Sequence, residues 1–191
     1  AAFAQKHPQL RIQHVSSSQT DDLIAGRFDV AIRLGHLADS THHARRLDQF
    51  AIYAVAAPSY LNTLADSAIQ NPEQLASATW IAHSRLSTPL SWQIVTPDGE
   101  SVLLSARHPA RIVADSASSL RAFALSGAGV AILPEWLVAD DIANGGLVRL
   151  LADHHFPQQG IYALYPNTRH VPEKVRSFID FLHQRLTSVR G

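Results

Sequence analysis

Two patterns of apolar residues follow each other along the chain. Short runs alternate apolar and polar residues, and the segments between them have apolar residues at helical spacing. Residues 10–15 (LRIQHV) alternate and predict a half-buried strand. A short helix is expected over residues 21–24, ending near Gly26, and a more buried strand over residues 28–34. Because a strand, a helix and a strand in this order form a βαβ unit, we expect the two strands to be parallel neighbours.

The rest of the chain continues this alternation of strands and helices. A long β-rich run covers residues 47–57, and the Asp98–Gly99 pair between two alternating runs indicates a hairpin. Further strands are expected at residues 79–82, 92–95, 101–104, 111–114, 130–133, 147–150 and 160–165. Helices are expected to begin at Pro58, Asn71, Asp115 and Pro134. A final amphipathic helix carries apolar residues at helical spacing, namely Val171, Val175, Phe178, Ile179, Leu182 and Leu186.

The pattern as a whole predicts an α/β fold without an internal repeat or a low-complexity linker. A boundary between two lobes would therefore run through strands, and the β-rich runs at residues 47–57 and 160–166 are the candidates for such crossings. Residues 1–6 have the character of the last turns of a helix that Pro8 stops. No cap precedes them, so we interpret the chain as a fragment cut inside or just before a helix.

Composition narrows the classes of function. Hydrophobic residues make up 46% of the 191 residues, charged residues 17%, and the formal net charge is zero. A chain that held nucleic acid by its phosphates would carry a basic excess, so no DNA contact is expected from this chain alone. The sequence has no cysteine, which excludes disulfides and thiolate chemistry and fits a reducing compartment. No apolar run reaches the roughly 18–20 residues of a membrane span, and the first residues do not form a signal peptide.

Signatures of enzymes, metals and cofactors are missing. The chain contains no GxSxG, GxxxxGK[ST], GxGxxG or HExxH motif. The glycines of residues 127–129 follow a helix and lead into a strand, which is typical of helix termination rather than phosphate binding. The pairs His42–His43 and His154–His155 are sequence neighbours that do not easily point at one metal ion. We therefore expect no enzyme activity, no metal site and no cofactor.

Five phrases occur in order along nearly the whole chain. They are FDVAIRLG at residues 28–35, APSYL at 57–61, AGVAILP at 128–134, IYALYP at 161–166 and VRSFIDFL at 175–182. Together they resemble phrases of the effector-binding domain of LysR-type transcriptional regulators. The resemblance implies a type 2 periplasmic-binding-protein-like fold, in which two α/β lobes are joined by two crossing strands and enclose a ligand cleft.

The resemblance also assigns lobe boundaries. Lobe I would comprise residues 1–56 and 161–191, and lobe II residues 57–160. The family's winged helix, its linker helix, the first strand of lobe I and the start of its first helix are not in the sequence. The sheet of lobe I is therefore expected to have an open edge.

Candidate ligand-binding residues follow the strands, because ligands of open α/β sheets lie outside the carboxyl ends of parallel strands. In lobe I they are Ser16, Ser17, Arg33, Leu34 and Gly35. In lobe II they are His83, Ser84, Asp115, Ser116 and Ala117.

Each candidate has a structural alternative. The helix that begins after Asp115 offers free N–H groups to a carboxylate, but Asp115 or Ser116 could simply cap that helix. Ser16 and Ser17 could equally be an ordinary polar loop. His83 could bind an anion, report pH, or be a partly exposed histidine. Arg33 could bind a carboxylate or form a salt bridge with Asp29.

The family resemblance implies a cytoplasmic regulator whose small-molecule effector is often a carboxylate. The domain would form homodimers or higher homo-oligomers through the helix near Ala4 and His7, the helix at residues 21–25 and the helix after Asp115. DNA would be bound only through the winged helix that this sequence lacks. The alternative is the solute-binding protein of a transporter, which shares the fold, and the N-terminal sequence of the full gene product would distinguish the two.

Overall fold

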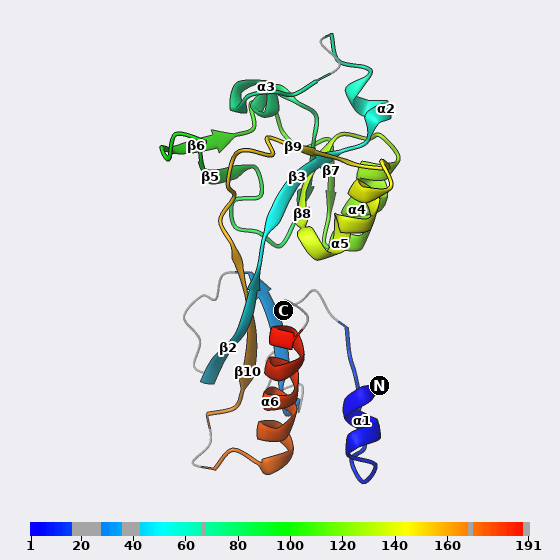
Figure 1. Ribbon diagram of the computed structural model, residues 1–191, viewed down its shortest axis with the longest axis vertical. Coiled ribbons are helices and arrows are strands. Elements are labelled where there is room, and N and C mark those ends of the chain that lie inside the picture. The colour runs from blue at the N-terminus through cyan, green and yellow to red at the C-terminus, as the bar shows by residue number, and fades with distance from the viewer. Residues whose placement is uncertain (17–27, 36–42, 66–67, 168–169, 189–191) are drawn as a thin grey trace. The chain divides into compact units, whose positions relative to one another are not determined.

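The computed structural model describes residues 1–16, 28–35, 43–65, 68–167 and 170–188, and Figure 1 labels its helices and strands. The chain divides into two compact units. Unit 1 comprises residues 1–49 and 159–191, and unit 2 comprises residues 50–158. The chain thus leaves unit 1 within one strand and re-enters it at the start of another.

Unit 1 is built on a small sheet covered by the C-terminal helix. Its elements are α1 (Ala2–Lys6), β1 (Ala31–Gly35), β2 (His43–Phe50, whose last residue belongs to unit 2), β10 (Gln159–Tyr165) and α6 (Glu173–Ser188). Among the described residues the strand order is β1-β10-β2, and β1 pairs antiparallel with β10 so that Arg33 lies opposite Tyr162. The predicted C-terminal amphipathic helix is confirmed, and it is α6.

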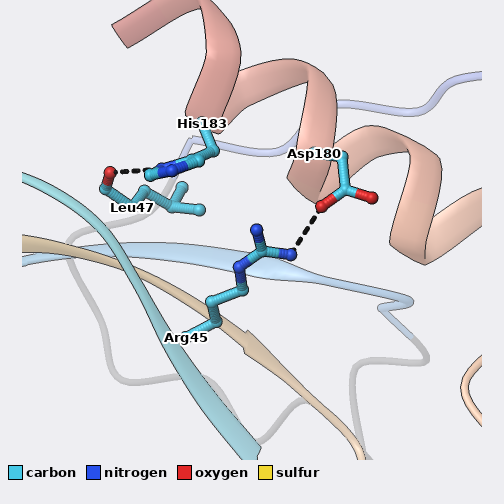
Figure 2. Close-up of polar contacts among 4 residues, drawn as sticks. All are labelled: Arg45, Leu47, Asp180 and His183. Carbon is cyan, nitrogen blue, oxygen red and sulfur yellow. Dashed lines mark hydrogen bonds and ion pairs between the residues drawn. The ribbon is translucent and has the colours of Figure 1, made fainter. Parts of the chain in front are cut away.

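The packing of α6 follows from its apolar spacing. Val175 and Ile179 lie four residues apart on one face and are buried against Leu47 of β2 and Ala163 of β10. Figure 2 shows that the Nδ1 of His183 also donates a hydrogen bond to the Leu47 carbonyl at 2.8 Å. One helix face thus supplies both the apolar and the polar attachment to the sheet.

Unit 2 contains a five-stranded sheet with the order β7-β4-β8-β3-β9 among the described residues. These strands are β3 (Ile52–Ala56), β4 (Trp80–His83), β7 (Ile112–Ala114), β8 (Val130–Pro134) and β9 (Val148–Leu150). Strand β4 is parallel to both β7 and β8, whereas β3 is antiparallel to β8 and β9. The sheet is therefore mixed, with its parallel part at one side.

Both faces of this sheet are covered, and the strand alternation assigns each residue to a face. Trp80 belongs to one buried cluster and its neighbour Ile81 to the other. The first cluster packs against the short helices α2 (Pro58–Leu61) and α3 (Pro72–Ser77) and the hairpin of β5 (Ser91–Val95) and β6 (Ser101–Ser105). The second packs against α4 (Ala117–Leu125) and α5 (Glu135–Ala143). The continuous apolar runs of β4 and β8 reflect this double burial.

One predicted strand was wrong. Residues 10–15 form no strand with any described part of the chain, and Ile12 and Val15 are each 49% exposed. An alternating pattern makes a strand only where a partner supplies hydrogen bonds, and the pattern does not reveal that partner. The predicted βαβ unit is likewise not seen, because β1 has the antiparallel β10 beside it, and the helix expected over residues 21–25 lies outside the described residues.

Candidate functional site

The parallel pairing of β4 with β7 brings two predicted loops to the same edge of the sheet. His83 lies opposite Ala114, and the Ser84 N–H donates to the Ala114 carbonyl at 2.9 Å. The segments that follow these strands therefore lie beside each other although they are about thirty residues apart in sequence. We call this group the edge site, and it consists of His83, Ser84, Arg85, Asp115, Ser116 and Ala117.

An ion pair links the two segments of the edge site. The NH2 nitrogen of Arg85 lies 3.9 Å from the Oδ2 of Asp115. The two side chains are 42% and 56% exposed, so water and salt screen the pair. The edge site thus contains an ion pair whose two side chains are largely open to solvent.

The ring of His83 is half-buried and is held through Nδ1. That nitrogen accepts a hydrogen bond from the Arg85 backbone N–H at 3.2 Å. Burial lowers the pKa of His83, with a smaller lowering by Arg85, while Asp115 opposes the shift. Because Nδ1 accepts, the neutral ring carries its proton on Nε2 and can donate from that atom.

Helix α4 begins at the edge site without a side-chain cap from its N-cap residue. Ser116 occupies the N-cap position in an extended conformation, and its hydroxyl makes no cap hydrogen bond. Plain capping therefore does not explain the presence of Ser116. Its hydroxyl and the first N–H groups of α4 lie next to Ala117, at the positive end of a nine-residue helix.

Three of the candidates in unit 1 lie on β1, and they do not all share a face. Arg33 and Gly35 are two residues apart and point to one side of the strand, whereas Leu34 points to the other and is 52% exposed. The Nε of Arg33 is buried and has no hydrogen-bond partner among the described residues. Asp29, the alternative partner, is bound by the Lys174 ammonium at 2.7 Å. The structure therefore shows no Arg33–Asp29 salt bridge within the described residues.

For the other predicted residues of unit 1, the structure shows the backbone conformation of Gly35 and the exposure of Ser16. Gly35 ends β1 with a φ of +102°, a backbone conformation that favours glycine. Ser16 is exposed at the end of the first described segment, and Ser17 lies outside the described residues.

The edge site also contains a residue that was not among the sequence candidates. Arg85 follows His83 and Ser84 directly, so it belonged to the loop that the sequence singled out. Its pairing with Asp115 depends on the β4–β7 register, which no local pattern reveals. Arg85 would have been found by counting every arginine or lysine in the loop after a predicted parallel strand as a candidate ligand-binding residue.

The two neighbouring histidines His154 and His155 have different contacts. The ring of His154 is buried and its Nδ1 lies 2.7 Å from the Oδ1 of Asp153, whereas His155 pairs with Val95 through its backbone. His42 lies outside the described residues. Within the described ranges, no three histidine, aspartate or glutamate side chains gather closely enough to hold a metal ion.

Comparison with known proteins decides the family. The family model described as the LysR substrate binding domain matches residues 1–187. This chain belongs to that family. The transcriptional regulator PtxR of Pseudomonas aeruginosa is 40% identical over 186 residues, which cover 97% of this chain and 58% of PtxR. The regulator CrgA of Neisseria meningitidis is 31% identical over 187 residues, or 97% of this chain and 60% of CrgA.

Solved structures agree with the sequence comparison. The regulatory domain of CrgA superposes with a TM-score of 0.80 at 30% identity, covering 97% of this chain and 88% of that domain. Full-length AphB, described as a Vibrio cholerae virulence activator, matches with a TM-score of 0.75 at 31% identity, covering 96% of this chain and 61% of AphB. The chain thus spans about 60% of the length of these full-length regulators.

The resemblance found in the sequence is confirmed, and with it the type 2 periplasmic-binding-protein-like α/β fold. The chain is the effector-binding domain of a LysR-type transcriptional regulator. These comparisons give no support to the alternative of a transporter's solute-binding protein. Among the described residues, no helix is long and apolar enough to cross a membrane.

Proposed function

We propose that this domain senses a small organic molecule that binds at the edge site of unit 2. The uncapped start of α4 carries the proposal. Ser116 sits where a capping side chain is expected, yet its hydroxyl is not used for the helix. A bound acceptor group, such as a carboxylate, would receive hydrogen bonds from that hydroxyl and from the free N–H groups of the first turn.

The neighbouring side chains support the same ligand class. The neutral His83 ring can donate from Nε2, and Arg85 supplies a positive charge. The hydroxyl, ring and backbone donors outnumber the single carboxylate of Asp115, so an acceptor-rich effector fits better than a basic one.

A thermal-shift screen of small carboxylates, aromatics and neutral polar compounds tests the proposal. A ligand that binds only the folded domain raises the melting temperature in proportion to the logarithm of its concentration at saturation. Ser116→Ala should abolish most of the shift produced by a hit without lowering the melting temperature of the free domain, because the hydroxyl does not cap α4.

Ser101→Ala, on the exposed hairpin strand β6, is the matched control and should keep the full shift. A hit whose shift is the same in Ser116→Ala and in Ser101→Ala would contradict binding at the edge site. Finding no hit across the panel would leave the domain without a ligand of the proposed class and would count against it.

For the whole protein, we propose DNA-binding regulation by ligand linkage. The effector favours one arrangement of the domain within a homo-oligomer and so changes the affinity of the intact protein for its operator. The relatives named above are transcriptional regulators, which supports this role. Fluorescence anisotropy of the intact protein on operator DNA, with and without a hit from the screen, measures the coupling, and an unchanged dissociation constant would refute it.

The same proposal places the protein in the cytoplasm, where the DNA is. It also proposes that the domain binds its ligand without converting it chemically. Incubation of a hit with the domain followed by mass spectrometry should return the compound unchanged. Conversion of the hit would overturn the assignment.

A further inference from the structure

A cavity of about 380 Å³ lies beside α3 in unit 2. Its lining residues come from the segment after α2, from α3 and its C-cap Ala78, and from the loop between β6 and β7. Ala78 precedes the amino end of β4, whereas the edge site follows the carboxyl end of that strand. The cavity is therefore separate from the edge site, and its volume suits a small ligand, because small-molecule pockets span roughly 300–1,000 Å³.

Two residues of opposite charge line this cavity without pairing. Glu73 comes from α3 and Arg107 from the loop between β6 and β7. Among the residues that the structure describes, neither side chain makes a hydrogen bond or an ion pair, with the other or with a third residue. Both are exposed, so a ligand would replace water at each of them. The cavity thus presents one position that favours an anionic group and another that favours a cationic group.

The backbone that carries Arg107 is anchored to neighbouring segments. The Arg107 N–H donates to the Ala76 carbonyl of α3 at 2.8 Å, and the preceding N–H, of Ala106, donates to the Leu90 carbonyl at 2.9 Å. These bonds tie the β6–β7 loop to the helix that carries Glu73. The starting points of both charged side chains are therefore fixed before a ligand binds, which lowers the ordering cost of binding.

The neutral part of the lining supplies donors and an apolar wall. The Oδ1 of Asn71 accepts from the Gln74 N–H at 2.9 Å, and the Oε1 of Gln74 accepts from the Gln70 N–H at 2.7 Å. Because these bonds use the oxygens, the NH₂ groups of Asn71 and Gln74 remain as donors. Ile69 and Ala78 belong to the buried core, so the apolar wall is part of a packed cluster.

We propose that this cavity is a second ligand site, which binds a small aliphatic amino acid. Arg107 binds the carboxylate, Glu73 binds the ammonium group, and the apolar wall that includes Ile69 and Ala78 contacts the side chain. A zwitterion gives each charged residue a partner of opposite sign, whereas a ligand with a single charge leaves one of them with water alone. The inference goes beyond the proposed function, because it concerns a different site and does not depend on binding at the edge site.

NMR titration of this chain with L-leucine tests the proposal. Isocaproate is the same molecule without the ammonium group, and isoamylamine is the same molecule without the carboxylate. Leucine should bind about fivefold or more tightly than either analogue, because each analogue lacks one charge-assisted contact.

Two substitutions separate the two charged contacts. Arg107→Gln should weaken the binding of leucine and isocaproate by about fivefold or more and leave that of isoamylamine within about twofold. Glu73→Gln should weaken leucine and isoamylamine by a similar factor and leave isocaproate within about twofold. Neither substitution should change the melting temperature, since neither side chain makes a hydrogen bond or ion pair among the described residues.

Matched controls remove the same charges elsewhere in unit 2. Arg111→Gln and Glu100→Gln change exposed residues that do not line the cavity. Both should leave leucine affinity within about twofold of the parent, the screened effect of a charge outside the site. Ser116→Ala, in the edge site, should also leave leucine binding unchanged.

Absence of leucine binding at millimolar concentrations overturns the proposal. So does an analogue that binds as tightly as leucine, or leucine binding that neither Arg107→Gln nor Glu73→Gln weakens more than the two controls do. Loss of leucine binding in Ser116→Ala would move leucine to the edge site, and it would refute this inference while supporting the proposed function. Leucine binding that depends on Arg107 and Glu73 supports this inference even if the thermal-shift screen finds no ligand for the edge site.

Discussion

Arg121 of α4 and Asp141 of α5 form a two-pronged ion pair. The Arg121 Nε lies 2.5 Å from one carboxylate oxygen of Asp141, and its NH2 lies 2.6 Å from the other. Asp141 is only 12% exposed, so its carboxylate is largely shielded from water. The hydrogen bonding of Arg121 to this carboxylate is the main cause that raises the pKa of Arg121. Helix α4 lies beside α5 (Figure 1), and the pair fixes these two helices to each other.

Asp141→Asn should therefore destabilise unit 2. The substitution keeps the shape of the side chain but leaves the guanidinium without its charged partner. We expect the melting temperature to fall by about 2–4 °C, as measured by circular dichroism. Asp98→Asn, at an exposed position in the turn between β5 and β6, is the control and should change the melting temperature by less than about 1 °C. Equal effects of the two substitutions would show that the pair does not hold the helices.

Gly129 should tolerate no side chain. Its φ is +148°, and a Cβ at this position would lie 2.3 Å from the Thr79 carbonyl oxygen, which already accepts a hydrogen bond from the Val130 N–H. Backbone cannot move aside as a flexible side chain can, so Gly129→Ala should lower the free energy of unfolding by about 3 kcal/mol or more. Gly99→Ala, where φ is +85° but nothing lies within 4 Å, should cost only about 1–2 kcal/mol of backbone strain. Urea denaturation of both variants measures the difference, which should vanish if the close approach to Thr79 is unimportant.

The two polar contacts of α6 in Figure 2 should differ in strength. The Arg45–Asp180 pair is 2.6 Å long, but its side chains are 43% and 53% exposed, so Asp180→Asn should cost less than about 1 kcal/mol. His183→Ala should cost about 1–2 kcal/mol, because it removes a part-buried hydrogen bond to the Leu47 carbonyl. Hydrogen exchange of the α6 amides compares the two variants, and the reverse order would contradict the assignment.

Stability should depend on pH through His83. Because burial lowers the pKa of His83 in the folded domain below its ordinary value of 6.5, the unfolded chain takes up a proton first as the pH falls. His83 therefore costs no stability above pH 6.5, and stability declines from there until the pH passes the folded-state pKa. Melting curves of the parent and of His83→Gln across this range should converge at higher pH and separate below it. Parallel curves would exclude His83 as the group responsible.

The pKa of His83 should depend on the two charged residues beside it. Asp115 raises the pKa of His83 and Arg85 lowers it, so Asp115→Asn should lower and Arg85→Gln should raise the histidine pKa that NMR measures. Shifts in the opposite directions would contradict the arrangement of the edge site.

The alternation of strand and helix patterns predicted most elements of unit 2 because those patterns are local. The Asp98–Gly99 hairpin and the buried strand β8 follow from neighbouring residues, and both are present. The helices expected to begin at Asn71 and Asp115 are also present, and they begin one and two residues later, at Pro72 and Ala117. The family phrases added the fold and the role of the domain, which the comparisons confirmed.

The sequence by itself thus determined the class of the elements, their order and the loops in which ligand chemistry was expected. Tertiary structure alone decided that residues 10–15 have no partner strand in the described part of the chain, that β1 pairs with β10 and that Arg85 meets Asp115. The physical reason is common to all three. Pairing and charge contacts between segments distant in sequence depend on sheet register, and register is set by the packing of the whole unit rather than by local pattern.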